Sequence, residues 1–377
     1  MKKLILLLFI PLVFGCSGGD GGSDDSNNPC PNQPQLTTLE VSNIEIDMST
    51  YLSSATFSGE IQNIQLGANC ETFSITNQGF VYSTNIQPTT SDNVVNANGE
   101  NASANVSDLI NGKTYYVRAY LTNTLGTFYG NEVSFTTNNP IYLAENGITI
   151  KAKDWAEVGM MGEINGLTYT IVDILMLNDL IENEEDVTVA CTSLITDMSY
   201  LFADPNSDFN QDISSWDVSN VTDMTQMFNY TPFNQDISFW DVSSLTIMNY
   251  MFYRAHNFNQ DISSWDVSNV TEMNGVFELA YNFNQDISNW DVSNVTSMVA
   301  MFAAAITLNQ DLSLWDVSNV TNMYAMFQNA FAFNQDLSSW NVNNVSVCID
   351  FCLDTEGDMN WTLPKPNFTN CGDTGCN

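Results

Sequence analysis

The chain has 377 residues, enough for two or three domains with substantial cores. It carries 44 Asp and Glu against 8 Lys and Arg, a formal charge of −36 at pH 7, which makes nucleic acid and anionic lipid headgroups poor partners because both are repelled. An apolar share of 44%, with 12% aromatic residues, excludes a disordered acidic chain.

The first 16 residues have the order of a secretory signal. Lys2 and Lys3 precede an apolar run from Leu4 to Phe14, which is too short to span a bilayer. The ending Val-Phe-Gly-Cys resembles a bacterial lipobox, and this resemblance implies that Cys16 becomes the lipidated first residue. An ordinary cleaved signal is the alternative. We expect the lipid to be the only membrane attachment.

Residues 17–35 are rich in Gly, Ser and Asp and are expected to form a flexible acidic tether. The segment resembles the surface-export signals of some Gram-negative lipoproteins. That resemblance implies an outer-membrane lipoprotein exposed at the cell surface.

Residues 36–138 predict a β-sandwich, because short alternating segments are separated by Asn, Gly and Ser turns. From Tyr115 to Leu121 every second side chain is apolar, and Leu109 precedes this strand. These features resemble the fibronectin type III family with its tyrosine corner, which implies a spacer or a binding platform. Cys30 and Cys70 flank the first strands and are candidates for a disulfide.

Residues 139–189 are expected to be a linker and an N-terminal cap, with a strand over 168–173 and a helix over 175–181. Residues 190–357 then repeat. Each repeat carries a near-copy of Phe-Asn-Gln-Asp-Ile-Ser-x-Trp-Asp-Val-Ser-Asn-Val-Thr-x-Met-x-x-Met-Phe, and its tryptophans are 24 or 25 residues apart: Trp216, Trp240, Trp265, Trp290, Trp315 and Trp340. A period of this size indicates stacked supersecondary units.

Each unit is predicted to contain a strand, a turn and a short helix. Residues 209–214 alternate in polarity, which favours a strand. Met224, Met227 and Phe228 have helical spacing, and Thr222 is placed to cap that helix. The predicted fold class is therefore multi-domain α+β, with a β-sandwich followed by a leucine-rich-like strand-turn-helix solenoid that has a parallel sheet.

A covalent cap is predicted at the C-terminal end, in residues 358–377. Cys348 and Cys352 stand where the preceding repeat has Met323 and Phe327, and Cys371 and Cys376 follow in the tail. We expect disulfides between 348 and 371 and between 352 and 376.

The single histidine, His256, leaves no plausible zinc set.

The repeats resemble those of bacterial surface lipoproteins related to BspA, on the strength of Asp-Ile-Ser-x-Trp-Asp-Val-Ser-Asn-Val-Thr-x-Met. This resemblance covers residues 190–357. It implies adhesion to host cells, neighbouring cells or matrix proteins.

The repeats place two polar side chains at fixed positions of the predicted strand, and together they form the candidate ligand or cation face. Parallel strands would bring equivalent carboxylates to about 4.8 Å from one another, so hydrogen bonds from the asparagines or bridging by calcium are the two ways to relieve their repulsion. The Asn row is Asn210, Asn234, Asn259, Asn284, Asn309 and Asn334, and the Asp row is Asp212, Asp236, Asp261, Asp286, Asp311 and Asp336.

We predict a binding protein rather than an enzyme. Catalysis needs unlike groups that converge on one site, and these repeats offer identical copies. The expected function is surface adhesion through an extracellular protein. Glycan capture for nutrient uptake is the alternative, and a glycoside hydrolase is less favoured. No cofactor is expected, and calcium on the Asp row is the alternative.

Overall fold

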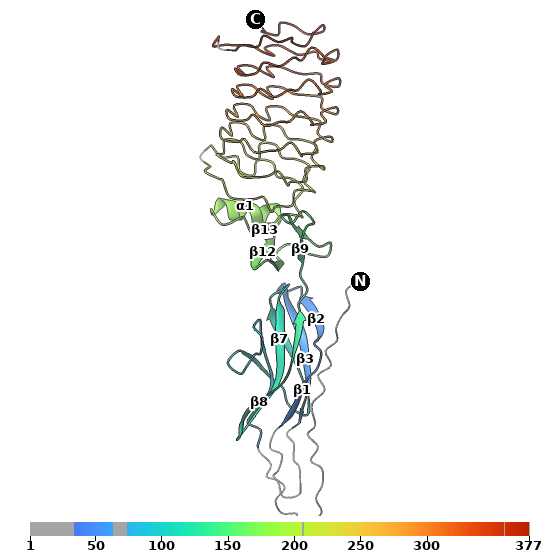
Figure 1. The fold of residues 1–377 in the computed structure, drawn as a ribbon, viewed down its shortest axis with the longest axis vertical. Helices are drawn as coiled ribbons and strands as arrows, with labels where there is room; N and C mark the ends of the chain where they lie inside the picture. Colours follow the sequence, from blue (N-terminus) through green and yellow to red (C-terminus); the bar gives the residue numbers. More distant parts are fainter. Residues whose placement is uncertain (1–33, 63–73, 206, 358, 377) are drawn as a thin grey trace, which may run out of the picture.

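The computed structural model describes residues 34–62, 74–205, 207–357 and 359–376 (Figure 1). The molecule is elongated, with a β-sandwich at one end, a small cap in the middle and a column of stacked repeats at the other end. The predicted signal peptide, Cys16, Cys30 and Cys70 lie outside the described residues. Within the described residues, no helix is long and apolar enough to cross a membrane.

Two antiparallel sheets form the sandwich and share one core around Phe57, Phe80 and Val117. The alternating segment from Tyr115 to Leu121 lies within one strand of the second sheet. The Tyr115 hydroxyl accepts a hydrogen bond from the Ile110 backbone N–H at 3.0 Å. In the first sheet, β3 (Leu52–Gln62) pairs with β1 (Gln35–Thr38), β2 (Ser42–Asp47) and β6 (Asn101–Leu109). The second sheet has the order β5 (Asn93–Asn96), β4 (Asn77–Ser83), β7 (Thr114–Asn123) and β8 (Gly126–Thr136).

The cap consists of two small sheets and one helix, α1 (Ile174–Glu182). The carboxylate of Asp173 accepts the Met176 N–H at 2.8 Å and thus caps this helix, which contains the predicted segment 175–181. The strands β9 (Ile141–Leu143) and β10 (Ile150–Ala152) form a hairpin, and β11 (Met161–Ile164), β12 (Leu167–Ile171) and β13 (Ala190–Cys191) form a three-stranded sheet.

From residue 192 to residue 357 the described chain has no named strand or helix. Each repeat forms one coil of turns that stacks on the next coil (Figure 1). Neighbouring coils are joined by isolated parallel bridges, which link Asp197, Asp223, Ile247, Glu272, Ser297, Asn322 and Val347 in succession.

The predicted strand-turn-helix solenoid with a parallel sheet is therefore wrong. In the described residues α1 is the single α-helix, and the paired strands are antiparallel except for β12 with β13. The helix expected over 224–228 is absent because Gln226 and Tyr230 have left-handed backbones, with φ of 56° and 66°. Alternate backbone N–H groups of this segment donate to the next repeat, as from Gln226 to the Asn249 carbonyl at 2.8 Å.

The strand expected over 209–214 is absent for a related reason. The Asp212 carboxylate accepts the Ser214 N–H at 3.0 Å and bends the chain. The Asn210 amide oxygen accepts the Asn234 N–H at 2.9 Å. Side chains thus take hydrogen bonds that the carbonyls of a sheet would otherwise accept.

Aromatic side chains fill the column. Phe252 and Phe277 stack with ring centroids 5.7 Å apart, and Trp240 and Trp265 stack at 6.4 Å. The six repeated tryptophans are 0–5% exposed, and each indole N–H donates to a backbone carbonyl, as Trp265 does to Ile237 at 3.1 Å. These tryptophans are structural and do not offer open rings to a ligand.

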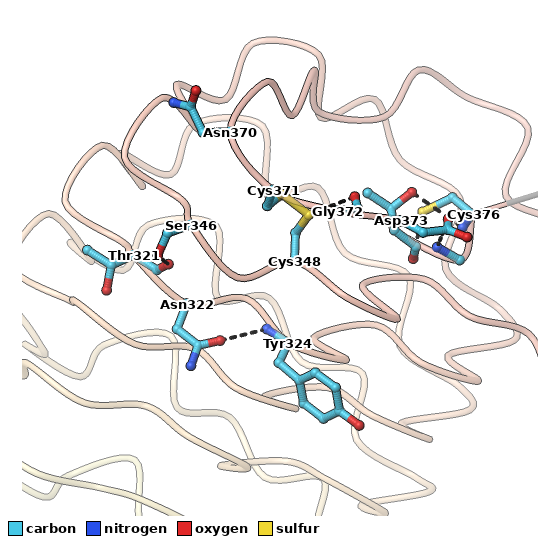
Figure 2. The surroundings of a disulfide bond; sticks show 12 residues. Thr321, Asn322, Tyr324, Ser346, Cys348, Asn370, Cys371, Gly372, Asp373 and Cys376 are labelled. Carbon is cyan, nitrogen blue, oxygen red and sulfur yellow. Dashed lines mark hydrogen bonds between the residues drawn. A yellow bond between two sulfur atoms is a disulfide. The ribbon is translucent and has the colours of Figure 1, made fainter.

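Two disulfides close the C-terminal end with the predicted pairing, and Figure 2 shows the one between Cys348 and Cys371. Cys348 joins Cys371 and Cys352 joins Cys376, with Cα atoms 5.7 and 5.0 Å apart. Next to them, the Trp361 ring covers the last phenylalanines of the column and is only 5% exposed.

Candidate ligand-binding surfaces

The Asn row is an internal ladder. From Asn210 to Asn309, each amide oxygen accepts the backbone N–H of the equivalent asparagine in the next repeat at 2.9 Å. Asn334 ends the ladder by accepting the N–H of Thr362 in the C-terminal cap at 2.8 Å. These amide oxygens hold the coils together, so the predicted ligand role has no support in their contacts.

All six carboxylates of the Asp row are exposed, and each one accepts the backbone N–H of the serine two residues later at 2.9 or 3.0 Å. Hydrogen bonds from this serine lower the pKa of Asp261, Asp286 and Asp336 below its ordinary value. The row is a line of exposed carboxylates, one for each coil.

Calcium bridging of this row is one of the two alternatives that the sequence leaves open. In the part of the chain that the structure describes, no group of three or more His, Cys, Asp or Glu side chains is placed to hold a metal ion. The Asp row is thus not a preformed cation site in the sense of a multidentate cage.

A second row of aspartates follows the tryptophans, and its first member differs from the others. Asp217 is 4% exposed, whereas Asp266 and Asp316 at the same repeat position are exposed. The β9–β10 hairpin places Lys151 at 3.2 Å from the Asp217 carboxylate. Ser193 also donates to this carboxylate at 2.6 Å, so the buried charge is paired and hydrogen-bonded.

A group of rings and one cation lies where the repeats depart from one another. We call it the tyrosine–arginine cluster and define it as Tyr230, Tyr250, Tyr253, Arg254, His256 and Tyr281. The Arg254 guanidinium lies 4.8 Å from the Tyr230 ring centroid and 5.5 Å from that of Tyr253, and its Nε donates to the Tyr253 hydroxyl at 3.1 Å. His256 stacks on Tyr281 with centroids 4.4 Å apart.

The repeat pattern does not point to this cluster, because Arg254 and His256 stand at positions where the repeats differ in sequence. Its signal was an exception to the pattern, since Arg254 is the only Lys or Arg between residues 190 and 357 and His256 is the only histidine of the chain. Arg254 occupies the repeat position of Tyr230, Leu279 and Ala304, and all four have left-handed backbones. The shared backbone aligns these side chains along one side of the column.

A cavity of about 690 Å³ lies between the end of α1 and the first coil. Its lining includes Ile181, Glu185, Tyr200, Phe209 and Gln211. The Gln211 amide accepts the Val187 N–H at 2.9 Å and donates to the Glu185 carbonyl at 3.0 Å, so this part of the wall is tied to the cap.

Among known families, a match is found only for the repeats and the helix before them. A family described as "Mycoplasma protein of unknown function, DUF285" matches residues 175–278 and 260–357, which include α1 and the column. This match is consistent with a repeat protein. No curated protein and no solved structure matches the chain.

Proposed function

We propose that the protein is a surface-anchored lipoprotein without enzymatic activity, whose repeat column binds a macromolecular ligand and mediates adhesion to a cell surface or to matrix. The order of signal, tether, sandwich and column in the chain supports this proposal. A lipid on Cys16 would hold the chain at its N-terminal end.

The direction of the sandwich also supports an adhesive role. Gln35 pairs with Gln62 at one end of β3, whereas the start of β3 faces the cap, where Asn111 donates to the carbonyls of Tyr51 and Met161. The 11 residues of β3 separate these ends by roughly 35 Å. β1 therefore begins at the end of the sandwich opposite the column, and a membrane anchor on that side would let the column project outward.

The observation that carries the binding role is the tyrosine–arginine cluster. Tyr and Arg are the residue types enriched in binding hot spots, because they combine large contact areas with hydrogen bonding. The cluster is partly exposed and lies in a column whose repeated polar side chains are mostly engaged in ladders and turns.

Two measurements test this function. The full chain should partition into the detergent phase, and Cys16→Ala should move it to the aqueous phase; equal partitioning would reject the anchor. Purified full chain on arrays of extracellular proteins and glycans should bind a defined subset, and replacing Tyr253 and Arg254 together by Ala should reduce that binding. Binding that is unchanged in the double variant would reject the cluster as the ligand site.

Glycan capture for nutrient uptake is the second candidate function. The exposed rings of Tyr281 and His256 favour it, because the apolar face of a sugar packs against aromatic rings. Uptake of a labelled glycan by cells that carry the protein, lost when the gene is deleted, would distinguish capture for nutrition from adhesion.

A further inference from the structure

The tyrosine–arginine cluster is held rigidly before any ligand arrives. The Tyr230 N–H donates to the Tyr253 carbonyl, and the Arg254 N–H donates to the Glu278 carbonyl, both at 2.9 Å. These bonds fix the backbones of three successive coils. A site built on such a scaffold loses little conformational entropy on binding.

Gly275 shows how closely one ring is packed. A Cβ atom at this position would lie only 2.2 Å from Cδ1 of Tyr250, so the glycine leaves room for the ring. Tyr250 in turn meets Tyr253 edge to face, with centroids 5.9 Å apart and planes at 90°. Tyr250 is therefore a positioning residue that supports Tyr253.

Arg254 has donors to spare. Its Nε donates to the Tyr253 hydroxyl. Arg254 forms no ion pair within 4.0 Å among the described residues, where the two such pairs are Lys113 with Glu163 and Lys151 with Asp217. No hydrogen bond joins the two terminal NH₂ groups of Arg254 to another described residue. The partly buried Glu278 carboxylate is close enough to interact electrostatically with Arg254, but it lies more than 4.0 Å away and leaves these N–H groups available. A guanidinium with free terminal N–H groups matches the two oxygens of a carboxylate.

Aromatic surface lies within reach of this guanidinium. The His256 backbone N–H donates to the Arg254 carbonyl at 2.8 Å, and Tyr281 is 36% exposed. His256 is stacked on Tyr281, and its Nδ1 lies 2.8 Å from the Leu279 carbonyl, which holds both rings in place. The site thus offers a cation beside a stack of two rings, which presents an outer ring face to a ligand.

We propose that the tyrosine–arginine cluster binds a sugar residue that carries a carboxylate, with the carboxylate on Arg254 and a face of the sugar ring on an outer face of the His256–Tyr281 stack. This inference rests on the proposed binding function and specifies its ligand. One cation in an acidic column attracts a single carboxylate, whereas the exposed aspartates repel a chain of closely spaced anions. The favoured ligand is a glycan with isolated acidic sugars.

The test measures binding of full-length protein to three probes by calorimetry. Sialyllactose and a hyaluronan tetrasaccharide carry carboxylates on different sugars, and lactose is the neutral match for sialyllactose. We expect at least one acidic probe to bind about tenfold or more tightly than lactose, and this preference to weaken at high salt. Which acidic probe binds identifies the type of acidic sugar.

Three variants locate the site. Arg254→Gln should abolish the preference for the acidic probe, and Tyr253→Phe, which removes only the hydroxyl that holds Arg254, should weaken it several-fold. In the matched control, Arg254→Gln is combined with Ala304→Arg, which restores the net charge at the same backbone position two coils away. This control should not recover binding, and its thermal unfolding midpoint should show that the column remains folded.

Binding of both acidic probes no tighter than that of lactose, no binding of any probe, or recovery in the control would each overturn the inference. The proposed function is separable from it, because a chain that binds extracellular proteins on an array but none of these sugars would keep the adhesive role.

Discussion

Asp217 shows how one residue of a repeat changes its character when a neighbouring element covers it. Burial alone would raise the pKa of its carboxyl group, but hydrogen bonds from Ser193 and Ser219 and the charge of Lys151 together lower it. The same position in later coils is exposed, and the carboxylate there needs only to hold its own turn. The local motif is the same, but its contribution to stability differs.

Replacing this carboxylate should therefore cost more in the first coil than elsewhere. Asp217→Asn should lower the free energy of unfolding by about 1 to 3 kcal/mol, because it leaves Lys151 without its counter-ion. The control Asp266→Asn should change the free energy of unfolding by less than about 0.5 kcal/mol. In the last repeat an asparagine, Asn341, already stands at this position and holds the same turn by accepting the Asn343 N–H at 3.3 Å. Equal losses in urea unfolding would contradict this account.

The lowered pKa of Asp217 also makes a prediction about pH. A carboxyl whose folded pKa lies below its unfolded value, about 3.9, stabilises the fold above that pH, and this contribution is lost as pH falls through the folded pKa. The thermal midpoint of the wild type should thus drop between about pH 5 and about pH 2. Asp217→Asn should drop less over the same range, and parallel curves would show that Asp217 does not contribute.

At the scale of the element, the coils are turns that repeat, and left-handed residues are what keep them from becoming helices. One such position carries Gln226, Tyr250, Gly275, Ala300 or Ala325 in successive coils, with φ between 51° and 58°. Only a glycine adopts this backbone without a steric penalty.

Two alanines of one coil test this turn. Ala300 has a φ of 51°, whereas Ala303 is not among the residues with positive φ, and both are buried. Ala300→Gly should leave stability unchanged or increase it, and Ala303→Gly should lower the free energy of unfolding by about 0.5 to 1 kcal/mol. In a helix both changes would cost about 1 kcal/mol, so equal losses on chemical unfolding would favour the helix.

The Asn row makes a parallel prediction for the ladder. Asn284 accepts the Asn309 N–H at 2.9 Å and also binds the Gln310 amide, whereas Asn289 in the same coil is exposed and has no hydrogen-bond partner among the described residues. Asn284→Ala should lower the free energy of unfolding by about 1 kcal/mol, and Asn289→Ala should have no measurable effect. Equal effects on the thermal midpoint would remove the ladder from the stability of the column.

Periodicity predicted which residues are buried, but not the backbone that buries them. Met224, Met227 and Phe228 are fully buried, as their spacing indicated. A chain of turns can bury residues at this spacing just as a helix can, so the spacing does not distinguish the two backbones. The left-handed residues have no common side chain, so no residue type marks them in the sequence. The disulfide pairs were predictable because the cysteines replace core residues of the preceding repeat, whereas the tyrosine–arginine cluster depends on neighbours in three coils.

At the scale of the whole molecule, the column has a single continuous core that extends from Val172 in the cap to Trp361 at the far end. The sandwich has a core of its own. Each coil covers its neighbour, and the last coil is covered only by the disulfide-linked tail. In such an array, stability is a sum of local and nearest-neighbour contributions, so loss of an end should affect the nearest coils first.

The C-terminal disulfides should therefore protect the end of the column. Each closes a loop with a sequence separation of 23 or 24 residues, for which the chain-entropy effect is about 2 to 4 kcal/mol. In the variant with Cys371→Ser and Cys376→Ser, the tail should detach and expose Phe351, which it now covers. Amide hydrogen exchange should then speed up most in residues 323–357 and least in 192–228, while the sandwich stays unchanged. Uniform exchange along the column would instead mean that the coils unfold as one unit and that the tail does not act as a local cap.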